Sequence, residues 1–84
     1  MIHFTLYTRS YCHLCDEMLA ALRAFGDAWV FTVETLDVDA DPRLVAQYDE
    51  LVPVLLGRKD AGEPVQLCQY LLDPSKVRTF LENA

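Results

Sequence analysis

Two cysteines separated by two residues, Cys12 and Cys15, constrain this chain more than any other feature, because of the patterns on either side of them. The residues before them alternate between apolar and polar, with apolar residues at Ile2, Phe4 and Leu6. Alternation of this kind is typical of a strand with one buried face. The residues after them are apolar at helical spacing, at Cys15, Met18, Leu19, Leu22 and Phe25. The sequence therefore predicts a strand over residues 2–7, a short loop, and a helix over residues 12–25 that ends at Gly26.

A Cys-x-x-Cys pair at the start of a helix indicates thiol redox chemistry. Two thiols three positions apart lie on one helical turn, close enough to form a small disulfide ring. The unpaired N–H groups and partial positive charge of the helix N-terminus favour the thiolate of Cys12, which is the reactive form in disulfide exchange. Arg9 and His13 favour this thiolate further, whereas the carboxylates of Asp16 and Glu17 oppose it. Cys15 belongs to the apolar helix face, so we expect it to be the more buried thiol.

The rest of the chain predicts three more strands and two more helices. The strands are expected at residues 29–36, 52–56 and 65–68, with a hairpin connection over residues 57–63. Each of the two further helices begins at an Asp-Pro pair, which supplies a capping carboxylate and a proline at the first helical position. These pairs are Asp41-Pro42, before a helix ending near Tyr48, and Asp73-Pro74, before a helix whose apolar face is Val77, Phe80 and Leu81.

This order, β-α-β-α-β-β-α, predicts an α/β domain with a four-stranded mixed sheet. The first two strands are joined through a helix and should be parallel, whereas the last two are joined by a short turn and should be antiparallel. Helices are then expected on both faces of the sheet. The Cys12–Cys15 loop follows the first strand, so it should lie at the carboxyl end of that strand, where reactive loops of such sheets are found.

Length and composition limit the possible function classes. The 84 residues predict a single domain over residues 1–84. The net charge of −6 argues against nucleic-acid binding, which needs clustered basic residues. The sequence contains no run of about 18 apolar residues, so no membrane span is expected. The absence of a recognisable signal peptide and the odd count of three cysteines favour a cytoplasmic location with reduced thiols.

Two motifs resemble those of glutaredoxins. Residues Tyr7-Thr8-Arg9-Ser10-Tyr11-Cys12-His13-Leu14-Cys15 resemble the glutaredoxin sequence Tyr-Thr-Lys-x-x-Cys-Pro-Tyr-Cys. Leu51-Val52-Pro53 resembles the Thr-Val-Pro sequence of the same family. Together with the element order, they make the chain similar to glutaredoxin-like proteins of the thioredoxin-fold superfamily. The resemblance implies a thioredoxin-like fold and a thiol–disulfide oxidoreductase that reduces protein disulfides or glutathione mixed disulfides, in which Cys12 attacks and Cys15 resolves.

The same resemblance implies a set of substrate-binding residues. Arg9 takes the place of the glutathione-contacting Lys of the family. Val52 offers its backbone to the peptide groups of a bound thiol compound, and the bond before Pro53 is cis. Tyr11 either covers the thiol or fills the loop. His13 is either a proton shuttle and a charge beside the thiol or a solvent-facing residue at the start of the helix.

The chain departs from the family at two places. His13-Leu14 replaces the Pro-Tyr between the cysteines, and Leu67-Cys68-Gln69-Tyr70 stands where the family has a Gly-Gly pair after the fourth strand. That pair makes room for glutathione in the family. Because the pair is absent here, an external dithiol, such as a thioredoxin-reductase-type system, is a candidate reductant beside glutathione. A second function class stays open: a non-catalytic binding module that keeps the thioredoxin fold.

Other residues predict no bound cofactor and no metal. A second Cys-x-x-Cys or a His-x₃-His is missing, so a structural zinc site is not expected, and no residue requires an iron–sulfur cluster. The acidic group Asp37, Asp39 and Asp41 lacks the pattern of a calcium loop and is expected to be a solvated turn beside a helix cap. Cys68 lies in an apolar strand and is expected to be a reduced core residue. We expect a monomer.

Overall fold

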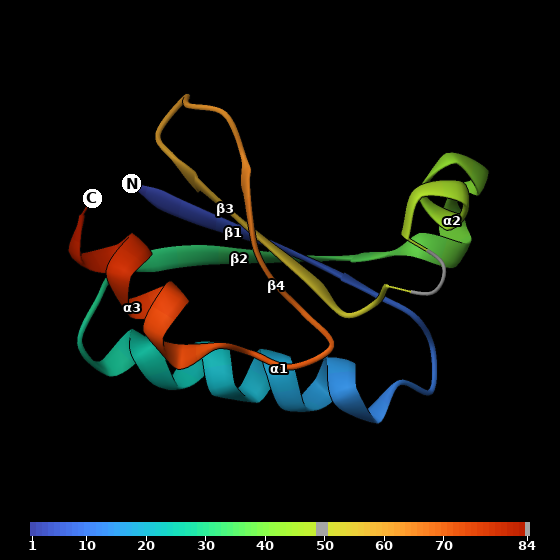
Figure 1. The fold of residues 1–84 in the computed structure, drawn as a ribbon, viewed down its shortest axis with the longest axis horizontal. Coiled ribbons are helices and arrows are strands. Elements are labelled where there is room, and N and C mark those ends of the chain that lie inside the picture. The colour runs from blue at the N-terminus through green and yellow to red at the C-terminus, as the bar shows by residue number, and fades with distance from the viewer. Residues whose placement is uncertain (49–50, 84) are drawn as a thin grey trace.

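The computed structural model describes residues 1–48 and 51–83. Its elements, in chain order, are β1 (Ile2–Thr8), α1 (His13–Ala24), the 3-10 helix η1 (Phe25–Asp27), β2 (Phe31–Asp37), the 3-10 helix η2 (Val38–Ala40), α2 (Pro42–Tyr48), β3 (Val54–Lys59), β4 (Val65–Gln69) and α3 (Pro74–Glu82). The strands and α-helices follow one another in the predicted order (Figure 1).

The four strands form one mixed sheet in the order β2-β1-β3-β4. β1 pairs with β2 in parallel, and Ile2 lies opposite Phe31. β3 pairs with both β1 and β4 in antiparallel orientation, and the β3–β4 register shifts between Leu55 and Leu56. The predicted parallel first pair and antiparallel last pair are therefore confirmed. The crossover through α1 permits the parallel pair, and the short connection after Lys59 permits the hairpin.

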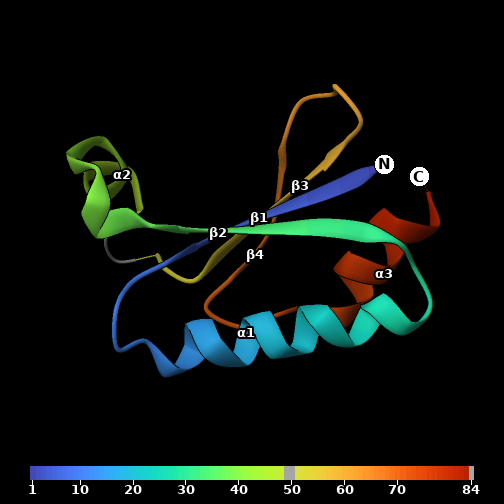
Figure 2. The same cartoon turned by 180° about the vertical axis from the view of Figure 1, so that it is seen from behind.

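One face of the sheet is covered by α1 and α3 (Figures 1 and 2). The alternation in β1 turns Ile2, Phe4 and Leu6 to this face, where none is more than 6% exposed. The helices contribute the other half of this core, with Met18, Leu22, Val77 and Leu81. Asp73 caps α3 as predicted, because its carboxylate accepts hydrogen bonds from the backbone N–H groups of Ser75 and Lys76 at 3.0 and 3.3 Å.

The opposite face is covered at one end by α2 (Figure 1). A second, smaller core lies there, and it consists of Val38, Tyr48 and Val54. The Tyr7 ring stacks on the Tyr48 ring with centroids 4.4 Å apart, so the last turn of α2 rests on the carboxyl end of β1. Helices thus lie on both faces of the sheet, as expected.

Two boundaries of the first helix differ from the prediction. α1 begins at His13, because Cys12 has extended backbone angles and serves as the N-cap. α1 ends at Ala24 and continues into the 3-10 helix η1, which contains Gly26. Gly26 does not have a positive φ, so it is not a left-handed helix stop.

The second and third strands also differ from their predicted bounds. β2 begins at Phe31 rather than at residue 29, because Ile2 pairs with Phe31 and β1 offers no partners before that point. β3 covers Val54–Lys59 rather than residues 52–56, so Gly57 lies inside the strand and not in the hairpin. The Phe80 ring packs over Gly57, where a Cβ atom would lie only 2.7 Å from Phe80 Cε2. Within the described residues, no helix has the length and apolar character needed to cross a membrane.

Candidate active site

Cys12 and Cys15 form a disulfide at the start of α1, with their Cα atoms 5.2 Å apart. Cys12 is the N-cap, and its Sγ accepts a hydrogen bond from the backbone N–H of Cys15 at 3.1 Å. Cys15 is 3% exposed on the buried face of α1, whereas Cys12 is only half-buried. The more buried position predicted for Cys15 is confirmed. An accessible sulfur and a shielded one at a helix N-terminus are the arrangement that stepwise disulfide exchange needs.

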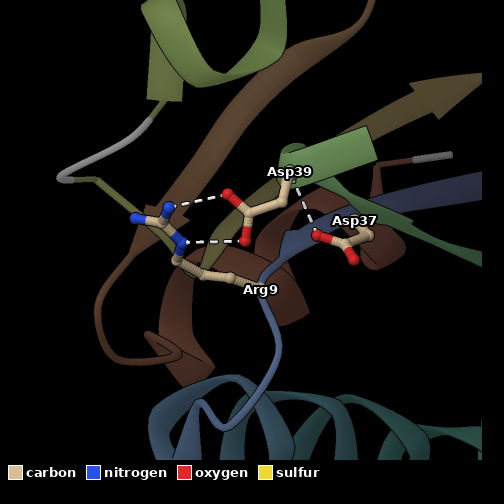
Figure 3. A network of polar contacts seen from close by, with 3 residues as sticks. All are labelled: Arg9, Asp37 and Asp39. Atoms are coloured by element: carbon tan, nitrogen blue, oxygen red, sulfur yellow. Dashed lines mark hydrogen bonds and ion pairs between the residues drawn. The ribbon is translucent and has the colours of Figure 1, made fainter. Parts of the chain in front are cut away.

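Arg9, in the loop after β1, is held by a carboxylate of η2 (Figure 3). Its Nη2 and Nε donate to the two Asp39 carboxylate oxygens at 2.7 and 3.3 Å. Asp39 is itself positioned by Asp37, whose carboxylate accepts from the Asp39 backbone N–H at 2.9 Å. The hydrogen bond from Arg9 holds the pKa of the Asp39 carboxyl below its usual range. The acidic segment is thus an exposed turn beside a helix cap, as predicted, and one of its carboxylates also pairs with Arg9.

The residues on either side of Cys12 are exposed. Tyr11 has a φ of 59° and a fully exposed side chain, so its ring neither covers the disulfide nor fills the loop. His13 is exposed at the first position of α1, which agrees with the solvent-facing alternative for its side chain. A part for Tyr11 or His13 in substrate binding stays a prediction.

Val52 and Pro53 form the bend before β3, and the peptide bond between them is cis. The pairing of β1 with β3 ends at Tyr7 and Val54, so the sheet ladder does not include this bend. The Pro53 carbonyl oxygen accepts a 2.9 Å hydrogen bond from the backbone N–H of Tyr70, in the turn after β4. The structure therefore joins two segments that sequence reasoning considered separately.

Sequence reasoning assigned no site role to three residues that the fold brings together at the first turns of α1. Leu14, Tyr70 and Leu71 line one hollow of about 300 Å³ along α1. Tyr70 has a φ of 66°, a conformation that favours glycine. It ends the segment Leu67-Cys68-Gln69-Tyr70, in which the resemblance to glutaredoxins would place a Gly-Gly pair. The sequence signal was therefore present as a missing glycine, but only the structure shows that the backbone keeps a glycine-like turn and adds a large side chain to it.

Cys68 is free, 6% exposed and located in β4. Its Sγ accepts a 3.3 Å hydrogen bond from the Asp73 backbone N–H. Burial raises the pKa of this thiol. These properties agree with the predicted reduced core residue. In residues 1–48 and 51–83, no three His, Cys, Asp or Glu side chains gather closely enough to hold a metal ion.

The comparison with known families bears on this geometry. The family described as Glutaredoxin-like domain (DUF836) matches residues 3–82. The chain belongs to this glutaredoxin-like family. The match spans nearly the whole chain, including both cysteines and the Val52–Pro53 bend.

Solved structures agree with the family and with the fold. Protein Ne2328 from Nitrosomonas europaea is 34% identical with a TM-score of 0.83, and the match covers 95% of this chain and 91% of that one. Target protein XcR50 from X. campestris is 32% identical with a TM-score of 0.62, and the coverage is 96% and 97%. Trichomonas vaginalis thioredoxin shares the fold at 21% identity and a TM-score of 0.65, over 98% of this chain and 78% of that one. No curated protein matches the sequence.

The chain is thus a glutaredoxin-like member of the thioredoxin superfamily. Its fold, a four-stranded mixed sheet with helices on both faces, is the thioredoxin-like fold. The Cys12–Cys15 pair at the start of α1 fits a redox function.

Proposed function

We propose that this glutaredoxin-like protein is a dithiol–disulfide oxidoreductase that reduces protein disulfides or glutathione mixed disulfides. The observation that carries the proposal is the asymmetric pair at the start of α1. Cys12 is only half-buried and its Sγ accepts a hydrogen bond from the backbone N–H of Cys15, whereas Cys15 is almost fully buried. Helix N–H groups and the helix dipole stabilise a thiolate at Cys12 when the pair is reduced.

The reaction proceeds in two exchanges. In the first, the Cys12 thiolate attacks one sulfur of the substrate disulfide, and a Cys12–substrate disulfide forms as the other substrate sulfur leaves and takes up a proton. In the second, Cys15 loses its proton and attacks Cys12 Sγ, and the substrate leaves as a thiol. Two electrons pass from the dithiol to the substrate. The product is the Cys12–Cys15 disulfide, the form of the pair present in the structure.

The proposal requires no bound cofactor. Glutathione or an external dithiol, such as that of a thioredoxin-reductase-type system, would supply the two electrons that return the pair to its reduced form. A reducing cytoplasmic environment is the setting in which such a pair would act as a reductant.

The test uses two single substitutions and two disulfide probes, oxidised glutathione and insulin. Cys15→Ser should accumulate a Cys12 mixed disulfide, visible as a mass increase that dithiothreitol reverses. Cys12→Ser should abolish turnover with both probes. Cys68→Ala is the matched control, because Cys68 is a buried thiol in β4 outside the pair, and it should keep turnover. Exchange with neither probe in the reduced wild type would favour the non-catalytic binding module instead.

A further inference from the structure

We infer that Tyr70 determines the substrate class of the Cys12–Cys15 site. With its neighbours it selects a protein disulfide whose cysteine is flanked by an apolar and a basic side chain, and it disfavours glutathione. This inference rests on the proposed function, since it concerns the substrate of the same pair. Three observations carry it: the position of Tyr70, the apolar side chains around it, and the charges beside them.

The first observation is the position of Tyr70 in a tight turn after β4. Its backbone N–H donates a hydrogen bond to the Pro53 carbonyl oxygen. The N–H of the next residue, Leu71, donates to the Gln69 carbonyl oxygen at 2.8 Å. These two bonds hold the turn against the bend before β3. A glycine at this position would contribute no side chain to the surface beside the bend. Tyr70 is 42% exposed, and its side chain lines the hollow that Leu14 lines from α1.

The second observation is a gathering of exposed apolar side chains. Seven large hydrophobic residues in the described part of the chain are exposed, and four of them lie in the loop before Cys12, in the first turn of α1 or in the turn after β4. These four are Tyr11, Leu14, Tyr70 and Leu71. Leu14 lies between the two cysteines, and Leu71 is 66% exposed beside it in the same hollow. An apolar side chain next to the substrate cysteine would bury this surface, whereas glutathione has polar groups on both sides of its cysteine.

The third observation is the charge around the pair. Asp16 and Glu17 are exposed in the first turns of α1, and Glu17 lines the same hollow. The guanidinium of Arg9, at the position of the glutathione-contacting Lys, is bonded to both oxygens of Asp39. Glutathione carries two carboxylates and one ammonium group at neutral pH, so this surface repels it. A Lys or Arg beside the substrate cysteine is complementary to the same carboxylates.

The test compares two small disulfides. One is oxidised glutathione, and the other is the disulfide dimer of acetyl-Leu-Cys-Lys-amide. The rate at which each oxidises the reduced protein is measured by acid quenching, thiol alkylation and mass. Each rate is divided by the rate of the same disulfide with free dithiothreitol, which removes the intrinsic reactivity of the probe. The wild type should prefer the peptide by about tenfold or more, the range that a single apolar contact can give.

Substitutions then locate the preference. Tyr70→Gly removes the side chain and suits the backbone conformation at this position. Leu71→Ser removes the adjacent apolar side chain without changing the turn residue. Each variant should reduce the ratio of peptide to glutathione rates to about threefold or less. Val30→Ser is the matched control, because Val30 is an equally apolar, 81% exposed residue before β2, at the far end of α1. It should leave the ratio unchanged.

The outcomes separate the two proposals. A normalised ratio near one in the wild type, or a ratio unchanged by both Tyr70→Gly and Leu71→Ser, overturns the inference about Tyr70 and leaves the oxidoreductase intact. A reduced wild type that reacts with neither disulfide overturns the proposed function itself.

Discussion

The backbone N–H of Tyr70 donates a 2.9 Å hydrogen bond to the carbonyl oxygen of Pro53. This bond connects the turn after β4 to the cis bend before β3. The Tyr70 side chain lines the same hollow as Leu14, the residue before Cys15 in the sequence. One backbone bond therefore connects two loops that are far apart in the sequence, and Tyr70 and Leu14 line one hollow. Four predictions follow from this site and the fold that supports it.

The Arg9–Asp39 ion pair should reduce the reactivity of the site toward anionic substrates. Asp39→Asn removes the carboxylate that binds Arg9 but keeps the size of the side chain. The Asp39 carboxylate then no longer offsets the positive charge of Arg9, and the rate with oxidised glutathione should rise by about two- to fivefold. The measurement is the second-order rate constant for oxidation of the reduced protein at low salt.

Asp27→Asn is the control for this change, because Asp27 is an exposed carboxylate in η1 at the other end of α1. It changes net charge by the same amount and should leave the rate unaltered. If both variants raise the rate constant equally, the effect comes from net charge and not from Arg9. High salt should weaken the effect of Asp39→Asn, since the pair is exposed.

Tyr11 should be replaceable by glycine with a gain in stability. Its φ of 59° is unfavourable for a residue with a Cβ, and its side chain is fully exposed, so no packing is lost. Tyr11→Gly removes the unfavourable Cβ contact, whereas Tyr11→Ala keeps it. The glycine variant should exceed the alanine variant by about 1 kcal/mol in free energy of unfolding, measured by urea denaturation. An alanine variant as stable as the glycine variant would show that the loop adopts another conformation in solution.

Gly57 should be intolerant of a side chain, unlike Gly26. A Cβ at Gly57 would lie 2.7 Å from Phe80 Cε2 and 3.0 Å from Leu67 Cδ1, inside the core between the sheet and α3. Gly57→Ala should lower the free energy of unfolding by about 1–3 kcal/mol. Gly26→Ala is the matched substitution, since a Cβ there has no atom within 4 Å, and it should be neutral or stabilising by about 0.4–1 kcal/mol. Equal effects in thermal or urea denaturation would contradict the packing of Phe80 over Gly57.

The buried thiol of Cys68 should make stability fall at alkaline pH. Burial raises its pKa in the folded protein, so the native thiol stays protonated at a pH where the unfolded thiol has ionised. The unfolded state then binds fewer protons, and the free energy of unfolding decreases as pH rises from about 8.5 through the raised native pKa, by at most about 1.4 kcal/mol per pH unit.

This dependence is measured by urea denaturation between about pH 7.5 and pH 10, the range in which cysteine titrates. The background carries Cys12→Ser and Cys15→Ser, so that Cys68 is the only thiol and cannot exchange with a disulfide. Adding Cys68→Ala should flatten the decline. An identical decline with and without Cys68 would mean that other groups cause it.

The sequence by itself determined the element order and the position of the reactive pair. Alternation in β1 and helical spacing after Cys15 depend only on local residues, because each pattern follows from the geometry of a single element. Asp73 with Pro74 likewise marked the start of α3 through a cap that involves neighbouring residues alone.

Only the tertiary structure decided the strand bounds and the surroundings of the pair. Phe31 begins β2 because Ile2 is opposite it, and Gly57 belongs to β3 because β1 continues alongside. Arg9 pairs with Asp39 across 30 positions, Tyr70 donates its backbone N–H to Pro53, and Tyr70 and Leu14 line one hollow. These contacts depend on which strands and loops the folded chain places side by side. Local residue patterns contain no information about which distant segments become neighbours. The proposed thiol chemistry could therefore be predicted from two cysteines, whereas the proposed substrate preference rests on residues that only folding brings together.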